Sequence, residues 1–242
     1  MMLALITTRP ETKSRNAIEY GCIKTVNFPL TRIVYTLTPE EIRQEFEKFR
    51  PDALVFTSIV GSSRFLESVS HSDLKSCRIF CIGQMTASPF LSYGLECIVP
   101  SLKTSSGLST AILESCGNGS RIMIARSRHG SPVLTDALSG GHYQLKEIQI
   151  YDLEENMNAN LGLALRSDNY FGILITSSME ARIFGKLLNS LKIDIQRTAL
   201  KVFAIGIPTA MTLREIGIVP DQPIGDSDIS NLVGEISRKY CE

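Results

Sequence analysis

The sequence predicts an α/β protein with two similar, doubly wound parallel-sheet domains. Short apolar segments alternate with amphipathic, helix-forming segments along the 242 residues, and such alternation is typical of parallel sheets with right-handed crossovers. The chain also repeats itself. Residues 80–87 and 203–210 share an apolar strand that runs into Ile-Gly-x-x-Thr-Ala, with an offset of 123 residues. One half of the chain is therefore expected to fold like the other.

Composition limits the classes of function that the chain can have. A content of 43% hydrophobic and 21% charged residues can supply cores for two domains of about 120 residues each. Lysine plus arginine (25) equals aspartate plus glutamate (25), so no overall field draws the chain to nucleic acid or a membrane. Residues 1–6 are apolar but lack a basic leader, so we expect a first strand rather than a signal peptide. No apolar run approaches the ~20 residues of a membrane span.

Cysteines and histidines give no metal pattern. The six cysteines contain no C-x-x-C pair and mostly lie in or beside apolar segments, as reduced core cysteines do. We therefore expect reduced thiols and a cytoplasmic protein. The three histidines, His71, His129 and His142, have no metal-ligand spacing among themselves or with cysteine. We expect no metal site.

In the first half, apolar β-prone runs predict strands and capped amphipathic segments predict helices. The expected strands are residues 3–8, 22–28, 53–56, 78–82 and 96–99. The expected helices are residues 10–20, 39–49, 59–69, a segment after Gly83, and 106–115. Thr38, Pro39 and the carboxylates that follow predict a helix start, because they supply a cap, a first-turn proline and an acidic first turn. Residues 31–36 are β-branched and long for a turn, so we interpret them as an extended connector.

The second half repeats this order. The expected strands are residues 121–125, 143–150, 171–175 and 201–205. The expected helices are residues 132–138, 158–166, 178–188, a segment after Gly206, and a last helix that starts behind Ser227 and Asp228. The last helix has apolar residues at i, i+3, i+4 and i+7 from Ile229, which predicts a buried face.

Candidate functional residues follow the strands. In doubly wound sheets, ligands bind beyond the carboxyl ends of the strands. The residues expected there are Thr8 and Arg9, Thr57 and Ser58, Gly83 and Thr86, Arg126 to His129, Thr176 to Ser178, and Gly206 with Thr209. Glycine lets the backbone turn sharply, and the free N–H groups of a helix start can hold an anion. The set has no paired carboxylates, Ser-His-Asp order, Walker loop or G-x-G-x-x-G after a strand, so hydrolytic and nucleotide functions lose their usual support.

Each of these residues also has a purely structural interpretation. Threonine and serine after a strand commonly cap the next helix. Arginine is commonly solvated or bound to a helix end, and a tyrosine such as Tyr151 that ends an apolar strand usually keeps its hydroxyl in water. Their shared position at the strand ends favours a binding or catalytic role for the set.

Several motifs in order resemble the uroporphyrinogen-III synthase family. They are Thr8-Arg9-Pro10, V-F-T-S at residues 55–58, the two I-G-x-x-T-A copies, the tyrosine that ends residues 148–151, and D-S-x-I-x-x-L-V at residues 226–233. The resemblance covers essentially the whole chain. Two stretches depart from the family pattern: Gln84-Met85 replaces the commoner small residues or proline after Gly83, and Ser178-Met179-Glu180 replaces the usual Ser-Pro-x after Thr176.

The resemblance implies a domain arrangement that periodicity does not show. The two domains would have the flavodoxin-like fold, and the second would be inserted into the first. Domain 1 would contain residues 1–32 and 153–242, and domain 2 residues 36–149, with extended connectors at 33–35 and 150–152. An active cleft would lie between the facing strand ends.

The resemblance also implies a reaction. It is the cyclisation of hydroxymethylbilane to uroporphyrinogen III, with inversion of the D ring and loss of water, in tetrapyrrole, porphyrin and heme biosynthesis. This makes the chain a lyase without a cofactor, expected to be monomeric and to bind a tetrapyrrole substrate rather than nucleic acid or a membrane. Tyr151 would help the hydroxyl to leave, because a phenol can donate a proton. The implied substrate-binding set is Arg9, Thr57, Ser58, Gly83, Thr86, Arg126, Arg128, Thr176, Ser177, Lys201, Gly206 and Thr209.

Two other functions remain open at this point. One is a non-enzymatic two-domain protein or sensor that closes on a small ligand. The other is a nucleotide-sugar transferase with two Rossmann-like lobes, which usually needs a longer chain and a diphosphate loop.

Overall fold

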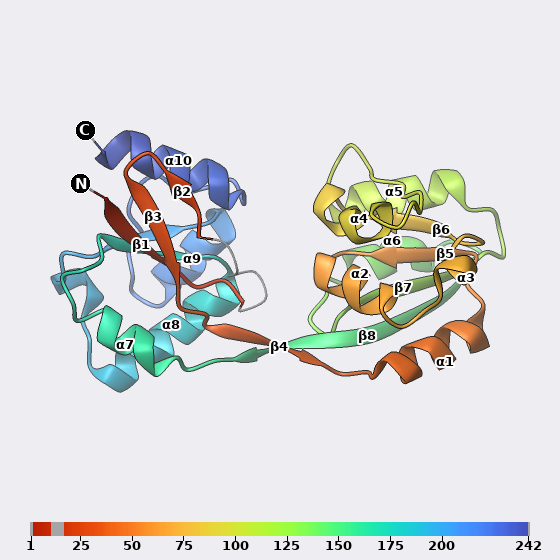
Figure 1. Cartoon of the computed structure of the whole chain (residues 1–242), viewed down its shortest axis with the longest axis horizontal. Helices are drawn as coiled ribbons and strands as arrows, with labels where there is room; N and C mark the ends of the chain where they lie inside the picture. The colour runs from red at the N-terminus through yellow and green to blue at the C-terminus, as the bar shows by residue number, and fades with distance from the viewer. Residues whose placement is uncertain (1, 11–16, 242) are drawn as a thin grey trace. The chain divides into compact units, whose positions relative to one another are not determined.

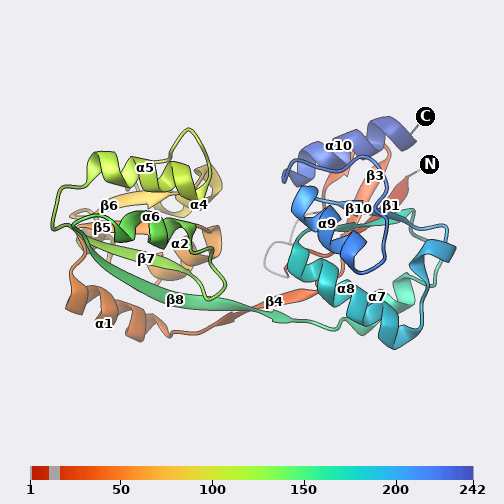
Figure 2. The same cartoon turned by 180° about the vertical axis from the view of Figure 1, so that it is seen from behind.

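The computed structural model describes residues 2–10 and 17–241, which fall into two units. Unit 1 contains Met1–Ile33 and Glu154–Glu242, and unit 2 contains Val34–Leu153. The chain passes from unit 1 to unit 2 within β4 (Thr31–Tyr35) and returns within β8 (Gln144–Glu155) (Figure 1). Each unit is a sheet of five strands covered by helices, as Figures 1 and 2 show from opposite sides.

The sheet of unit 1 has the strand order β10-β9-β1-β3-β2. The bounds in that order are Lys201–Ala204, Gly172–Ile175, Leu3–Thr7, Ile23–Asn27 and Glu19–Tyr20. The first four strands are mutually parallel, and β2 is antiparallel to β3. The predicted strands 3–8, 22–28, 171–175 and 201–205 are confirmed within a residue or two.

The helix predicted for residues 10–20 fails where it can be checked. Residues 11–16 lie outside the described residues, but Glu19 and Tyr20 form β2 instead of a last helical turn. The cause is Gly21, which has φ of 57° and lets the chain reverse at once into β3. Lys24 then pairs with Glu19 at 3.0 Å across the hairpin.

Helices cover both faces of the sheet of unit 1 (Figure 1). They are α7 (Ala159–Ala164), α8 (Ser178–Leu191), α9 (Ile207–Glu215) and α10 (Ile229–Tyr240), with a 3-10 turn at Ile195–Arg197. Ile173 and Ile175 of β9 pack with α7, α8 and α9, whereas Leu174 between them packs with α10. Successive side chains of a strand point to opposite faces, so one sheet serves two cores.

A disulfide joins Cys22 to Cys241 and corrects the expectation of six reduced cysteines. Their Cα atoms are 5.8 Å apart although 219 residues separate them in sequence. The spacing of cysteines along the chain could not reveal this pair, because only the packing of α10 beside β3 brings the thiols together. Cys77, Cys81, Cys97 and Cys116 are free.

The sheet of unit 2 has the strand order β4-β8-β7-β5-β6. The strands not yet given are β7 (Arg121–Ser127), β5 (Ala53–Phe56) and β6 (Arg78–Cys81). β8, β7, β5 and β6 pair in parallel. The strand predicted at 96–99 is wrong: only Ile98 bridges to Phe80, through its N–H to Ile79 and its carbonyl to Cys81. Pro100 follows two residues later and has no N–H to extend the ladder.

Unit 2 is also covered on both faces. Its helices are α1 (Pro39–Phe49), α2 (Ile59–Leu66), α3 (His71–Leu74), α4 (Gln84–Leu91), α5 (Ser105–Ser115) and α6 (Val133–Ser139). Val55 of β5 packs with α5 and α6. On the other face, the ring centroid of Phe56 lies 5.2 Å from that of Phe65 in α2 and 4.8 Å from that of Phe90 in α4.

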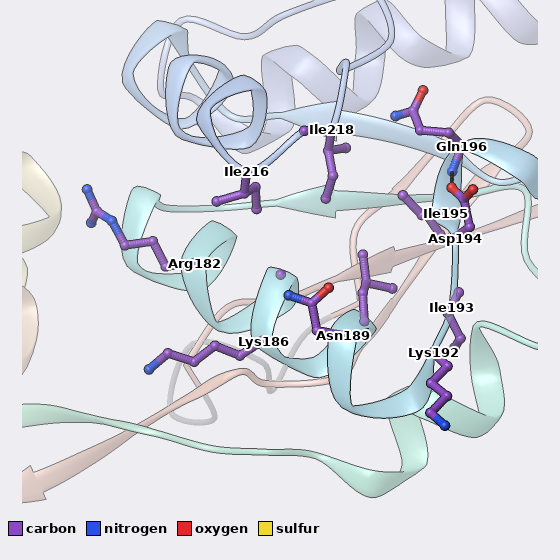
Figure 3. Close-up of a pocket in the computed structure, with 13 residues that line it drawn as sticks. Arg182, Lys186, Asn189, Lys192, Ile193, Asp194, Ile195, Gln196, Ile216 and Ile218 are labelled. Atoms are coloured by element: carbon purple, nitrogen blue, oxygen red, sulfur yellow. Dashed lines mark hydrogen bonds between the residues drawn. The ribbon is translucent and has the colours of Figure 1, made fainter.

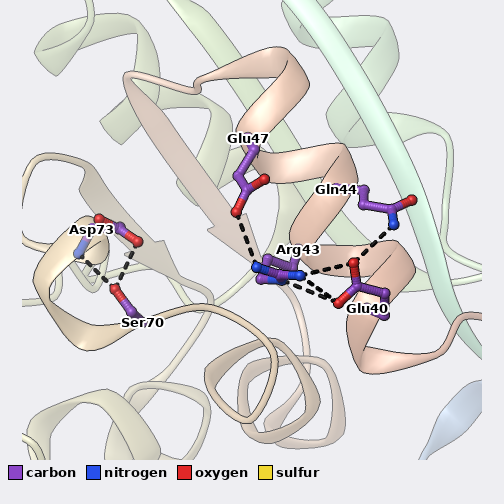
Figure 4. A network of polar contacts seen from close by, with 6 residues as sticks. All are labelled: Glu40, Arg43, Gln44, Glu47, Ser70 and Asp73. Atoms are coloured by element: carbon purple, nitrogen blue, oxygen red, sulfur yellow. Dashed lines mark hydrogen bonds and ion pairs between the residues drawn. The ribbon is translucent and has the colours of Figure 1, made fainter.

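The start of α1 confirms the predicted cap. Thr38 and Glu41 form a reciprocal capping box, and the N–H and hydroxyl of Thr38 lower the pKa of the Glu41 carboxyl. Figure 4 shows the next turns, where Arg43 binds Glu40 at 2.6 Å and Glu47 at 3.6 Å. These pairs are exposed to solvent, which screens them, so they add little to the stability of the helix.

Candidate active site

The candidate site residues lie at the carboxyl ends of the parallel strands. We call the strand ends of unit 1 rim 1 and those of unit 2 rim 2. Rim 1 consists of Thr8, Arg9, Thr176, Ser177 and Gly206, after β1, β9 and β10. Rim 2 consists of Thr57, Ser58, Gly83, Arg128 and Tyr151, after β5, β6 and β7 and at the end of the β7–β8 pairing. Parallel strands bring these ends to one edge of each sheet.

In rim 2, the Tyr151 hydroxyl donates a hydrogen bond of 2.9 Å to Ser58 Oγ. Ser58 is the N-cap of α2, and its Oγ also accepts the Gly61 N–H at 3.1 Å. Two bonds therefore hold Ser58 Oγ as an acceptor and leave its own proton to be donated elsewhere. Thr57, immediately before it, is partly exposed.

The position of Tyr151 depends on an irregularity in the sheet. The register between β7 and β8 shifts at Arg126 and Ser127, so Ser127 pairs with Tyr151 and the pairing ends there. The Arg128 N–H then donates to the Tyr151 carbonyl at 3.0 Å. A bulge of this kind commonly re-aims a side chain at a site, and Tyr151 is 7% exposed.

Beside Tyr151, the Asp152 carboxylate contacts a guanidinium and an imidazole. Arg128 Nη1 lies 3.4 Å from one oxygen and His129 Nε2 3.2 Å from the other. The Arg128 and His129 side chains are 55% and 65% exposed, whereas that of Asp152 is only 13% exposed. Asp152 therefore holds two solvent-facing nitrogen groups that can meet an anion.

Arg126 stands at the carboxyl end of β7, but its side chain is not exposed on rim 2. Its side chain is 7% exposed and pairs with Glu147 at 2.6 Å. The guanidinium also donates to the Ser131 carbonyl, and it lies so close under Gly130 that an added Cβ would be 2.6 Å from Arg126 Cδ. These contacts occupy Arg126 in holding the loop that presents Arg128, so we do not retain it as a substrate-binding residue.

Lys201 also lies away from the rims. It is the first residue of β10, which runs parallel to β9, so it lies at the amino edge of the sheet, opposite to rim 1. There it pairs with Asp221 at 3.1 Å. The family resemblance implied Lys201 as a cation for the carboxylates of the substrate. Its position at the amino end of β10 contradicts a place on rim 1.

The two repeated turns present backbone rather than side chains. Gly83 and Gly206 are the N-caps of α4 and α9, both extended and, within the described residues, both without a side-chain cap. Thr86 and Thr209, three residues later, are only 5% and 3% exposed. The threonine hydroxyls predicted to bind substrate are therefore buried, and the groups offered at these turns are the first N–H donors of each helix.

At rim 1, a buried carboxylate accepts hydrogen bonds from residues that follow or begin three different strands. Glu180 of α8 is 2% exposed and accepts hydrogen bonds from the Thr8 hydroxyl at 2.8 Å and the Thr176 hydroxyl at 2.6 Å. It also accepts the Thr176 N–H at 3.1 Å and the Thr31 hydroxyl at 3.2 Å. Burial raises the pKa of Glu180 above its ordinary value, and these hydrogen bonds oppose the rise.

Arg9 lies half-buried next to this carboxylate. Desolvation lowers the pKa of the Arg9 guanidinium, and the charge of Glu180 opposes that shift. An arginine stays protonated under either influence. The backbone is fixed too, because Asn27 donates to the Arg9 carbonyl at 2.9 Å and accepts the Thr7 hydroxyl at 2.7 Å.

Two carboxylates beside the rims, Glu180 and Asp152, were not selected from the sequence. For Glu180 a local signal exists. The sequence pattern marks it only as part of a departure from the family motif. Ser177-x-x-Glu180 is nevertheless a capping-box sequence, and Ser177 does cap α8 by accepting the Glu180 N–H at 3.1 Å. The glutamate side chain bonds Thr176 and the neighbouring strands, a result that depends on long-range packing.

Other features of the surface do not coincide with the rims. Figure 3 shows a cavity of about 530 Å³ beside α8, with Lys186, Asn189 and Lys192 along one wall. Neither Tyr151 nor any of the predicted substrate-binding residues lines it. Within residues 2–10 and 17–241, no group of three or more His, Cys, Asp or Glu residues could hold a metal ion, and none of the helices is long and apolar enough to cross a bilayer.

The fold and the rims define a two-domain α/β protein with hydroxyl, guanidinium and helix N–H groups at its strand ends, a set of donors suited to an anion. The family model described as uroporphyrinogen-III synthase HemD matches residues 12–233. The chain therefore belongs to the uroporphyrinogen-III synthase family.

Solved structures support the same fold. The chain is 17% identical to a mutant uroporphyrinogen III synthase from the extremely thermophilic bacterium Thermus thermophilus, with a TM-score of 0.62 and 98% of both chains covered. It is 15% identical to the uroporphyrinogen-III synthetase of Helicobacter pylori, with a TM-score of 0.66, covering 98% of this chain and 99% of that one. A search of curated proteins found no match.

Membership of this family makes the chain an enzyme of heme biosynthesis with a tetrapyrrole substrate. It supports the cyclisation of hydroxymethylbilane as the reaction, and it does not favour a non-enzymatic binder.

Proposed function

We propose that the chain acts as a cyclising hydro-lyase in which Tyr151 and Ser58 assist the loss of hydroxide from hydroxymethylbilane. The observation that carries this proposal is the 2.9 Å hydrogen bond from the Tyr151 hydroxyl to Ser58 Oγ at rim 2. A phenol bonded to a capping serine is a proton donor with a defined direction.

The proton path follows from the donor and acceptor roles. Ser58 Oγ already accepts from Tyr151 and Gly61, so its own O–H is free to point at the leaving hydroxyl. When the C–O bond breaks, its electron pair stays on the oxygen, Ser58 donates a proton, and water leaves. Tyr151 then passes its proton to Ser58. The pyrrole ring releases a proton after the new C–C bond forms, which restores Tyr151 and balances the reaction as the bilane minus one water.

The binding part of the proposal rests on the free N–H groups and arginines. The family resemblance implies a substrate with eight carboxylates. The starts of α4 and α9 lack side-chain caps in the described residues, so the N–H groups of Gln84, Met85 and Ile207 remain for carboxylates. Pro208, the second residue of α9, has no N–H to offer. Arg128 on rim 2 and Arg9 on rim 1 add guanidinium groups, which bind carboxylates with two N–H donors. We propose that these N–H and guanidinium groups bind carboxylates of the bilane and order its chain for ring closure.

The test is the isomer that forms. The purified chain is incubated with hydroxymethylbilane, and uroporphyrinogens I and III are resolved after oxidation to the porphyrins. We expect the type III isomer, because the bilane closes to type I without an enzyme. Formation of type I alone, at the rate without protein, would contradict the proposed function.

We also propose a monomer that works in the cytoplasm without a nucleic-acid partner. The equal numbers of cationic and anionic residues support the last point. Sedimentation of the pure protein at several concentrations checks the monomer, and a dimer at micromolar concentration would contradict it. Titration of free thiols in protein taken directly from cells checks the location. Six free thiols fit the reducing cytoplasm, whereas four would show that the Cys22–Cys241 bridge forms there and would count against it.

A further inference from the structure

We infer that Glu180 is a positioning residue: its buried carboxylate fixes rim 1 and holds Arg9 in place for a carboxylate of the substrate. This inference deepens the proposed function and rests on it, since it concerns binding by rim 1 of the same substrate. Glu180 itself, at 2% exposure, is too enclosed to contact a large ligand.

The contacts of Glu180 join segments that are remote in sequence. Oε2 accepts from the Thr8 hydroxyl after β1 and from the hydroxyl and N–H of Thr176 after β9. Oε1 accepts from the hydroxyl of Thr31 at the start of β4. One carboxylate thus ties three strand segments to the first turn of α8.

These bonds are hard to replace. A buried carboxylate is tolerated only when several donors satisfy it, and here three hydroxyls and one amide do so at 2.6–3.2 Å. Bonds to an ionised acceptor are stronger than neutral ones. Removing the charge would weaken the bond that holds the Thr8 hydroxyl. Because Arg9 follows Thr8 directly in the chain, its backbone would be held less firmly as well.

The charge of Glu180 also acts on Arg9 directly. Burial lowers the pKa of the Arg9 guanidinium, and the negative charge of Glu180 acts in the opposite direction. The other groups that face the carboxylate, from β4 and from the end of β9, are the threonine hydroxyls and the Thr176 N–H. The ionised carboxylate therefore attracts the Arg9 guanidinium, and its bond to the Thr8 hydroxyl fixes the residue that precedes Arg9.

The repeat within the chain shows that the strand-to-helix turn itself does not need this carboxylate. Thr57-Ser58 and Thr176-Ser177 are equivalent, with an offset of 119 residues, and the same offset places Gly61 opposite Glu180. Both serines cap their helices in the same way. At Gly61 an added Cβ would lie 3.2 Å from Ser58 Oγ and 3.3 Å from the Ala125 carbonyl. In rim 2, the glycine at this position leaves room around Ser58 for its bond with Tyr151. In rim 1, the equivalent position carries the Glu180 carboxylate, which in our inference holds Arg9 in place.

The experiment is a double-mutant cycle with Glu180→Gln and Arg9→Ala, measured as kcat and KM for uroporphyrinogen III formation. We expect Glu180→Gln to raise KM about tenfold with kcat within about twofold, because uniform binding is lost and chemistry is not. In the Arg9→Ala background the same change should raise KM less than about twofold further. The matched control is Glu41→Gln, another glutamate at the third position of a capped helix, which should leave both constants unchanged.

Additive effects of the two changes on KM, or an unchanged KM in Glu180→Gln, would overturn the inference. If Glu180→Gln does not fold, the pH dependence of KM still decides it. As pH rises through the raised pKa of Glu180, the wild-type KM should fall, and this component should be missing in Arg9→Ala. The same pH dependence in both proteins would overturn the inference. A wild-type chain that makes no type III isomer refutes the proposed function instead.

Discussion

The hydroxyl of Tyr151 lies 2.9 Å from Ser58 Oγ. This bond joins β8, at the point where its pairing with β7 ends, to the N-cap of α2. The two residues are 93 positions apart in sequence. Neither is unusual alone, since a serine after a strand caps a helix and a tyrosine at a strand end is common. Their bond turns the cap into an acceptor for a buried phenol.

Replacing Tyr151 with phenylalanine should slow turnover by about 10- to 1000-fold without abolishing it, the usual range for losing one acid group. Ser58→Ala should slow turnover by a similar factor, because it breaks the path between the phenol and the substrate. The double variant should be no slower than the worse single variant if the two act as one unit. Single-turnover rates of type III formation check this. Full activity of Tyr151→Phe would show that Tyr151 is not the acid.

Replacing Ser177 with alanine should lower the free energy of unfolding by about 1 kcal/mol, because Ser177 caps α8. Thr209→Ala tests the other hydroxyl, which is buried at 3% exposure. We expect a smaller loss of activity for both variants than for Tyr151→Phe. Denaturant unfolding and steady-state kinetics of the two variants are the measurements. A rise in KM larger than tenfold for Thr209→Ala would show that its hydroxyl reaches the substrate after all.

The pH dependence of stability should report Glu180. Its pKa is raised above the ordinary value of 4.5 in the folded state, so the folded protein binds this proton more tightly than the unfolded chain does. The stabilising contribution is fully present below the unfolded pKa and is lost as pH rises through the folded pKa. The free energy of unfolding of the wild type, relative to Glu180→Gln, should therefore fall with rising pH across that window. Parallel curves for the two proteins would contradict the shift.

Removing the disulfide should destabilise unit 1. Cys22→Ser should lower the free energy of unfolding by about 2–4 kcal/mol, because a bridge across a long loop restricts the unfolded chain. The control is Cys77→Ser, a free and partly exposed thiol in unit 2. Chemical denaturation with and without reductant measures both. Equal midpoints for wild type and Cys22→Ser under oxidising conditions would show that the bridge does not form in solution.

Much of the fold was predictable because it depends on local patterns. The apolar runs that form β1, β3, β5, β7, β9 and β10 are short, β-branched and separated by capped amphipathic segments. The repeated Ile-Gly-x-x-Thr-Ala turn identified two equivalent sheets. Predictions failed where few residues decided the outcome, as at Gly21, whose positive φ turns the chain into β3, and at Ile98, which makes a single bridge.

The sequence by itself determined the alternation of strands and helices, the duplication, and the side chains that follow each strand, because these depend on near neighbours in the chain. Only the tertiary structure decided which of those side chains are available. In the folded chain, Arg126 is buried against Glu147, and Lys201 lies at the amino end of its strand. Cys22 is paired with Cys241. The hydroxyls of Thr8, Thr31 and Thr176 all bond to Glu180. Each of these contacts joins residues well apart along the chain or depends on strand direction, which no local pattern encodes.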